Sequence, residues 1–362
     1  ARVLCSDGRW YTDWTAGLGP IVLGYRNEQV DNAVRAAVDA GPNFGLPTEL
    51  EEQVAERLCR IIPGAEAVRF GKNGNDVTSA AVRAARALTG RQLIVSQGYH
   101  GWAAEVGGGP NKIGVPPGFR DGTHEVFDWL DAGQRGSQSF PLNWVAAFIV
   151  EPDRCGDLSE LRRLCDGTGV LLIFDEILTG FRLNLGGAQA HYGVKAARIC
   201  LSKAMGNGYS EAAVCGPQEF MEPFAGGIGY SMTFAGETIG LAAAGATIDL
   251  MESYPVVEHL WKIGKQLQDG WNGIAKDLGL DIPCEGNPPR TVIRYPSLEA
   301  KTFVLEKMWE QGQMFTVGFT PTAAHDERNV DEALSAARGA LSALAEGQKP
   351  KGRSVGEVFR RP

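Results

Sequence analysis

Two residues that could do chemistry stand directly after two short apolar runs. Residues 170–174 are followed by Asp175, and residues 199–201 are followed by Ser202 and Lys203. In open α/β sheets, ligands bind beyond the carboxyl ends of the strands, where both side chains would lie. Pyridoxal phosphate (PLP) chemistry requires an amine that forms a Schiff base and an acid that keeps the pyridine nitrogen protonated. The pattern therefore favours PLP chemistry, with Lys203 and Asp175 as the catalytic residues.

The elements that must position this pair alternate along the chain. Five apolar residues in a row after Gly169 predict a strand covered on both faces. Thr48 is a good N-cap for a helix, with Glu51 at the capping-box position. Further strands are expected at 2–14 (as a hairpin), 68–70, 93–96, 145–150 and 199–201, and helices at 28–40, 49–62, 77–90, 158–168, 238–253, 256–278 and 330–346. Residues 291–330 are expected to mix short strands and loops. The alternation predicts a mostly parallel sheet with helices on both faces.

The composition excludes several classes of protein. The 362 residues are 44% hydrophobic and carry a formal net charge of -8, which argues against nucleic acid or an anionic membrane as the main partner. The seven cysteines are scattered without a CxxC pair, so neither a disulfide framework nor a zinc site is expected, and a cytoplasmic location is favoured. No membrane span or signal peptide is visible. Because the chain begins abruptly at Ala1 in a strand-like segment, further residues are expected upstream.

The order of several motifs adds a family resemblance. These motifs are DGRWYTDW, GPIVLGY, FGLPTELE, VRFGKNGND, AARALTGR, GYHGW, IVEP, FDEILTGFR, LSKAMGNG, TFAGE and AHDE. Together they resemble the class III PLP-dependent aminotransferases of fold type I, and among these the glutamate-1-semialdehyde aminomutases most. The resemblance covers nearly the whole chain. It implies a large PLP-binding domain at 43–250, a smaller α+β domain built from 1–42 and 251–362, and a homodimer.

The resemblance assigns roles around the cofactor ring. Lys203 would form the Schiff base and move a proton, and Asp175 would hold the pyridine nitrogen. Tyr99 would stack on the ring with His100 beside it, and Ile177 would pack beneath. The alternatives are ordinary structural roles: a solvated lysine, an acid that caps a helix, and aromatic or aliphatic core residues.

The cofactor phosphate would be held by a turn and by a second subunit. Gly74 and Asn75 resemble the phosphate-binding turn, although the family usually has a hydroxyl residue where Asn75 stands. Thr233 resembles the threonine that reaches the phosphate of the neighbouring subunit. A plain turn is the alternative for residues 73–76.

Four more residues fall where the family lines or supports the substrate pocket. They are Trp14, Leu18, Phe44 and Glu151. Packing is the alternative for the first three, and Glu151 is expected to support the site from behind.

Departures from the aminomutase pattern decide between two reactions. Arg2 does not align with the arginine that binds the substrate carboxylate in the aminomutases, and their gating loop is replaced by the shorter stretch 107–122. The segment between Glu151 and Leu161 is also short. Residues 316–319 lack the acid that precedes a Gly-Phe pair in the aminomutases. An aminomutase must retain its intermediate, whereas a transaminase must release its product. The sequence therefore predicts a transaminase that uses PLP and pyridoxamine 5'-phosphate, acting on an aldehyde or ketone such as that of a sugar or polyol. An aminomutase, a racemase or epimerase, and a partner-binding pseudoenzyme are the alternatives.

Overall fold

The computed structural model describes residues 1–106, 114–118, 123–125 and 141–352. It divides into two compact units, Glu28–Glu252 and a smaller one formed by Ala1–Asn27 with Ser253–Pro362. The helix at 28–40, which the sequence analysis placed with the small domain, belongs to the larger unit. Most of the stretch 107–122 and the end of the basic tail (353–362) lie outside the described residues.

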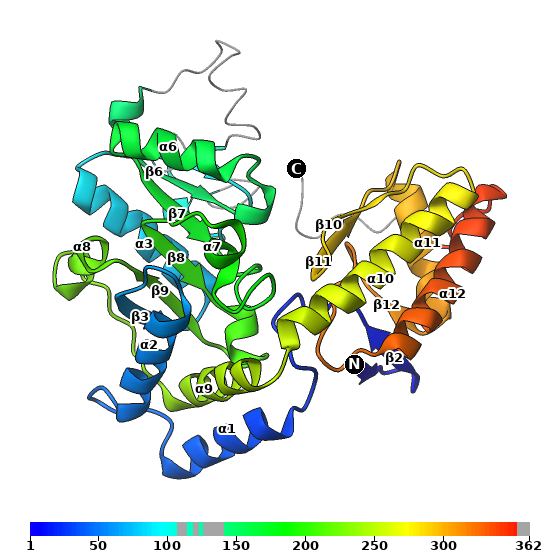
Figure 1. The fold of residues 1–362 in the computed structure, drawn as a ribbon, viewed down its shortest axis with the longest axis horizontal. Helices are drawn as coiled ribbons and strands as arrows, with labels where there is room; N and C mark the ends of the chain where they lie inside the picture. The colour runs from blue at the N-terminus through cyan, green and yellow to red at the C-terminus, as the bar shows by residue number, and fades with distance from the viewer. Residues whose placement is uncertain (107–113, 119–122, 126–140, 353–362) are drawn as a thin grey trace. The chain divides into compact units, whose positions relative to one another are not determined.

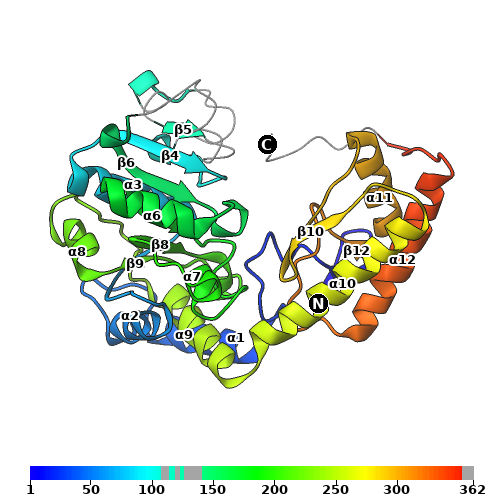
Figure 2. The same cartoon turned by 45° about the horizontal axis from the view of Figure 1, so that its top comes forward.

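The larger unit is built on a seven-stranded mixed sheet, counted over the described residues, in the order β3-β9-β8-β7-β6-β4-β5 (Figures 1 and 2). Its strands are β3 (Ala67–Gly71), β4 (Leu93–Gln97), β5 (Thr123–Glu125), β6 (Val145–Val150), β7 (Leu171–Asp175), β8 (Arg198–Leu201) and β9 (Ala212–Gly216). Strands β5, β4, β6, β7 and β8 pair in parallel, and β9 runs antiparallel to both β8 and β3. The predicted parallel core is therefore confirmed, with helices on both faces.

The helices of this unit are α1 (Glu28–Ala40), α2 (Glu49–Ile61), α3 (Gly74–Thr89), α6 (Leu158–Thr168), α7 (Gly187–Tyr192), α8 (Gln218–Met221) and α9 (Thr238–Ser253). The alanine-rich helix α3 packs along β6, β8 and β9 through small side chains. Helix α6 begins at the N-cap Asp157, whose carboxylate accepts from two backbone N–H groups, and ends at Gly169 in the left-handed conformation. The C-cap at Gly169 ends the helix two residues before β7 begins at Leu171.

The smaller unit has its own sheets and helices. Strands β1 (Arg2–Leu4), β2 (Trp10–Asp13) and β12 (Gln313–Met314) form one sheet, and β10 (Cys284–Asn287) and β11 (Arg290–Ile293) form another. The helices are α10 (Val256–Asp277), α11 (Leu298–Glu310) and α12 (Glu327–Ala345). Trp14, Trp271, Phe315 and Phe319 lie in its core, with edge-to-face contacts among them. No helix in the described parts of the chain is long and apolar enough to cross a membrane.

One stretch was predicted wrongly. Residues 291–330 were expected to be strands and loops, but they contain the 13-residue helix α11. Ser297 caps it by accepting a hydrogen bond from the Ala300 N–H. Its buried residues include Phe303, Val304 and Leu305 in succession, so the apolar residues do not follow the single stripe by which an amphipathic helix is recognised.

Candidate active site

The two residues singled out first lie at the ends of neighbouring strands: Asp175 is the last residue of β7, and Lys203 comes two residues after β8. Strands β7 and β8 are parallel, with Asp175 opposite Cys200, and the Glu176 N–H donates to the Cys200 carbonyl at 2.9 Å. Lys203 begins a short 3-10 helix (Lys203–Gly206) just beyond β8 and has a positive φ of 48°. The carboxyl ends of parallel strands meet at one edge of the sheet, so both residues lie at that edge. The left-handed backbone at Lys203 is uncommon outside glycine and is typical of functional sites.

Asp175 is held between a histidine and the backbone. Its Oδ2 lies 2.7 Å from His100 Nδ1, and its Oδ1 accepts from the Ile177 N–H at 3.1 Å. Both side chains are buried, and His100 Nε2 has no partner among the described residues. Burial disfavours the charged imidazole, but the hydrogen bond and charge of Asp175, with the charge of Glu151, raise the pKa of His100 above its ordinary value. The pair fixes the orientation of the Asp175 carboxylate.

The start of α3 provides a site for an anion. Asn73 and Asp76 form a capping box, in which Asp76 Oδ2 accepts from the Asn73 N–H at 2.8 Å. The first N–H groups of a helix have no acceptor within it and favour a phosphate. Gly74 lies in this first turn against the Ile177 side chain, which a Cβ at Gly74 would strike. The structure thus brings Gly74 and Ile177, both predicted to contact the cofactor, together.

Asn75 connects this helix to the loop after β4. Its Oδ1 accepts from the Trp102 and Ala103 N–H groups at 3.0 Å each. The amide oxygen is therefore engaged, which leaves the Nδ2 donors to serve another acceptor. One turn further along α3, the Thr78 hydroxyl donates to the His100 carbonyl at 2.7 Å. Thr78 was not predicted, because a hydroxyl in an alanine-rich helix gives no pattern to recognise.

Glu151 contacts the backbone of Tyr99 in the loop after β4. The Tyr99 N–H donates to Glu151 Oε1 at 3.0 Å, and Glu151 is buried whereas the Tyr99 side chain is 46% exposed. At Gly98, with φ 111°, a Cβ would lie 2.7 Å from the Glu151 carboxylate. Glu151 therefore fixes the backbone of the loop, whereas the Tyr99 ring is exposed to solvent. The next residue in the chain is the buried His100.

The remaining predicted residues lie in different surroundings. Thr233 and Phe44 are exposed in the larger unit, where Phe44 packs against Gly41. Leu18 is exposed in the smaller unit at a φ of 71°. Trp14 is completely buried in that unit, stacked on His325 at 4.0 Å between ring centroids, with its Nε1–H donated to Gln313. The structure thus places Trp14 in a packed core.

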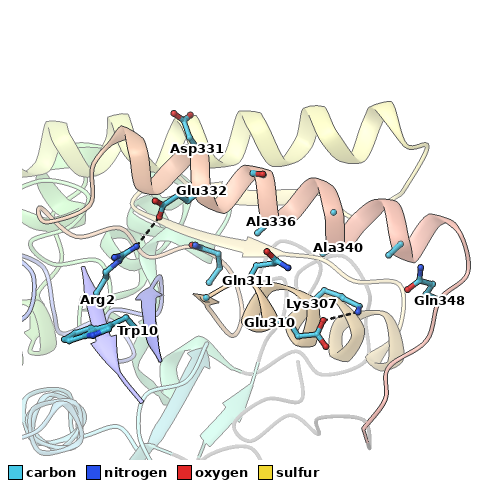
Figure 3. Close-up of a pocket in the computed structure, with 15 residues that line it drawn as sticks. Arg2, Trp10, Lys307, Glu310, Gln311, Asp331, Glu332, Ala336, Ala340 and Gln348 are labelled. Atoms are coloured by element: carbon cyan, nitrogen blue, oxygen red, sulfur yellow. Dashed lines mark hydrogen bonds and ion pairs between the residues drawn. The ribbon is translucent and has the colours of Figure 1, made fainter. Parts of the chain in front are cut away.

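A groove of about 900 Å³ lies in the smaller unit (Figure 3). Helix α12 lines one side with Ala336 and Ala340, and the ion pairs Arg2–Glu332 and Lys307–Glu310 border it. None of the predicted site residues lines it. Of its five charged lining residues in the described parts of the chain, Arg2, Glu332, Lys307 and Glu310 are paired with one another, and Asp331 is the fifth.

Comparison with known proteins identifies the class to which this fold and site belong. The family described as Aminotransferase class-III matches residues 1–106 and 142–287. The chain therefore belongs to the class III aminotransferases, the PLP-dependent family whose motifs it resembles, and the predicted fold class, cofactor and enzyme class are confirmed.

Two curated proteins and two solved structures show what this chain is similar to within and beyond its family model. The chain is 36% identical over 302 residues to a glutamate-1-semialdehyde 2,1-aminomutase of Methanothrix thermoacetophila, with 77% of this chain and 70% of the relative covered. It is 32% identical to the enzyme of the same name from Natronomonas pharaonis, covering 91% and 80%. Among solved structures, the FumI protein of Sphingopyxis sp. MTA144 in its PLP internal aldimine form superposes with a TM-score of 0.87 at 26% identity, covering 96% and 87%. A transaminase with PLP bound gives 0.86 at 25% identity, covering 96% and 90%.

Proposed function

We propose that this enzyme transfers an amino group from an external amine or amino acid donor to an aldehyde or ketone acceptor. The observation that carries the proposal is the sheet edge where Asp175, held by His100, ends β7 and Lys203 comes just after the neighbouring parallel strand β8. An amine and a fixed carboxylate at this edge are what PLP-dependent amino transfer requires.

The residues at this edge fit PLP. The first turn of α3 and the Asn75 amide suit its phosphate, and Asp175 suits its ring nitrogen. Tyr99 and Ile177 suit the two faces of its ring, with Ile177 already against Gly74. Lys203 would hold it covalently. When bound, PLP supplies an aldehyde carbon that accepts amines and a ring that accepts electron density.

The work of the chain's own residues follows from their chemistry. Lys203 Nζ takes a proton from the substrate carbon and returns one during transfer. The Asp175 carboxylate would pair with the ring nitrogen and keep that nitrogen protonated, and His100 Nδ1 holds the carboxylate in place. Glu151 keeps the Tyr99 backbone fixed, so that the aromatic ring can cover the cofactor.

A stretch in the smaller unit supports transfer to a separate acceptor rather than intramolecular transfer. The resemblance places an acid before a Gly-Phe pair in the aminomutases, and this chain has Thr316 and Val317 there. The Val317 carbonyl accepts from the Ile293 N–H at 2.8 Å, and Phe319 is fully buried. With no carboxylate in this segment, one part of the aminomutase gating machinery is missing. Sugar and polyol aldehydes or ketones are the proposed acceptors.

Glutamate-1-semialdehyde 2,1-aminomutase activity is the second candidate, favoured by the names of the two curated relatives. The two functions are separated by incubating the PLP-loaded enzyme with glutamate-1-semialdehyde alone, and separately with amino donors plus aldehyde or ketone acceptors. Transamination yields the donor's keto acid in step with the aminated acceptor. 5-Aminolevulinate formed without a donor would instead establish the aminomutase, and inversion with solvent deuterium uptake but no amino transfer would establish a racemase.

Lys203→Ala tests the assignment of the amine. We expect it to lower turnover by about a thousandfold or more, because Lys72, the other amine described at this edge, is engaged by Glu211 and Glu237. Lys195→Ala removes an exposed lysine of the same unit and should leave turnover unchanged. Equal turnover in wild type and Lys203→Ala would defeat the proposal.

We also propose a homodimer in the cytoplasm. Thr233 is exposed and the adjacent Phe234 is 57% exposed, which suits a segment that reaches the phosphate site of a second copy. Light scattering should give twice the mass of the chain, 38.8 kDa, and a monomer would refute the shared site. The cytoplasm is proposed because the scattered cysteines suit a reducing compartment, and cell fractionation checks it.

A further inference from the structure

Three charged residues of the larger unit form a cluster that the proposed chemistry does not use. Lys72 Nζ lies 2.7 Å from Glu237 Oε1 and 3.2 Å from Glu211 Oε2. The Glu211 side chain is completely buried, and those of Lys72 and Glu237 are 16% and 15% exposed. A buried carboxylate without a partner is costly, so the lysine is required wherever Glu211 is ionised.

Each member of the cluster is anchored to a different segment around the proposed cofactor. Lys72 precedes the capped start of α3, where its own N–H donates to Asp76 at 3.1 Å. Glu211 ends the loop that begins at Lys203, and its carbonyl accepts from the hydroxyl of Ser202 at 2.8 Å. Glu237 follows the Thr233 segment, where its carboxylate accepts from the Ile239 and Gly240 N–H groups at the start of α9.

These segments contact one another directly, so a displacement of one would displace the others. The Ser210 hydroxyl donates to the Lys72 carbonyl at 2.5 Å. At Gly240, an added Cβ would strike the Glu211 carboxylate and the Ser210 carbonyl, and it would lie 2.8 Å from Lys72 Nζ. Helix α9 therefore begins directly against the cluster, and no side chain can separate them.

We propose that Lys72 is a positioning residue for cofactor retention. Through Glu211 it ties the phosphate turn to the Lys203 loop, and through Glu237 it ties both to the Thr233 segment that would reach the cofactor of a second copy. It thereby sets the positions of groups that would hold PLP in both sites of the proposed homodimer. The inference rests on the proposed function, since it assumes that these three segments hold the cofactor. Lys72 itself touches neither cofactor nor substrate.

The test is titration of the apoenzyme with PLP, followed by absorbance, together with urea unfolding of the same apoprotein. Lys72→Met should raise the dissociation constant for PLP about tenfold to a hundredfold, because small misplacements of binding groups have effects of this size. Glu237→Gln should weaken PLP in the same direction, since it removes one of the three ties. Lys195→Met, at an exposed lysine of the same unit, should leave the dissociation constant unchanged.

A double variant separates positioning from simple support of the fold. Lys72→Met with Glu211→Leu removes the buried carboxyl group along with its partner, so unfolding stability should recover relative to Lys72→Met. We expect PLP affinity to stay weak, because the Thr233 segment remains untied. Affinity that recovers together with stability would overturn the inference, as would wild-type affinity in Lys72→Met. Wild-type protein that fails to bind PLP would instead refute the proposed function.

Discussion

The carboxyl edge of the large sheet and the core of the smaller unit bury polar groups in opposite ways. At the sheet edge, His100 lies against Asp175 and Glu211 against Lys72, each acid beside a potential cation. In the smaller unit, the buried His325 is stacked on Trp14, and burial lowers its pKa to about 3. His325 is therefore neutral at physiological pH, and its Nδ1 accepts from the Thr322 N–H.

This difference in buried groups separates the region proposed to act on a ligand from the region that stabilises the fold. Burying a charge is costly, and the core cluster around Trp271 in the smaller unit consists of apolar side chains. Retaining buried acids beside His100 and Lys72 at the sheet edge is understandable if these pairs orient groups that act on a ligand. In the smaller unit, aromatic packing around Trp271 provides the stability. Changes in the two regions should therefore affect different observables.

Removing the central aromatic side chain of the smaller unit should have the largest effect on folding. Trp271→Ala leaves a cavity beside Phe315 and Phe319 and deprives the Ile282 carbonyl of its donor. We expect a loss of about 3–5 kcal/mol in the free energy of unfolding by urea. Trp10→Ala, at a tryptophan that is 59% exposed, should change it by about 0.5 kcal/mol at most. Equal losses in both variants would contradict the view that packing at Trp271 dominates this unit.

At the sheet edge, Asp175→Asn should act on chemistry more than on folding. It keeps the shape of the side chain but removes the charge, and we expect turnover to fall roughly a hundredfold to a thousandfold. The pKa of His100 should fall as well, because Asp175 is what raises it. The chain has five histidines, so the His100 ring signal can be assigned by substitution and followed by NMR. Asp166→Asn, at an exposed aspartate of α6, should change neither quantity.

The smallest expected effect is on the pH dependence of stability. Burial raises the pKa of Glu176 from 4.5 to about 7, although N–H groups of Ala188 and Gln189 and the Thr179 hydroxyl oppose the rise. The folded protein therefore binds more protons than the unfolded chain between these values, and stability falls as pH rises through that window.

Glu176→Gln should make this decline shallower in urea unfolding at pH 5, 6 and 7, whereas Glu219→Gln, at an exposed glutamate, should not. A Glu176→Gln curve parallel to that of the wild type would show that Glu176 is ionised throughout.

Local patterns in the sequence were enough to predict the strands that end at Asp175 and near Lys203, and the helices with recognisable caps. Contacts between distant positions left no such pattern. His100 and Asp175 are 75 positions apart, and Lys72 lies 139 positions from Glu211 and 165 from Glu237. A lone lysine after a strand gives no indication that two acids will be folded against it. Strand β9 was likewise not predicted, because its five residues are too few to distinguish a strand from other buried segments.

The hydrogen bond from the Ser202 hydroxyl to the Glu211 carbonyl has a consequence for engineering. It closes the segment that carries Lys203 into a ring, and the β8–β9 ladder begins immediately beside it, with Leu201 opposite Ala213. The number of residues in the loop between Ser202 and Glu211 is therefore fixed. A transplanted segment one residue longer or shorter would turn the amine away from the sheet edge, so substrate range is better altered elsewhere in the chain.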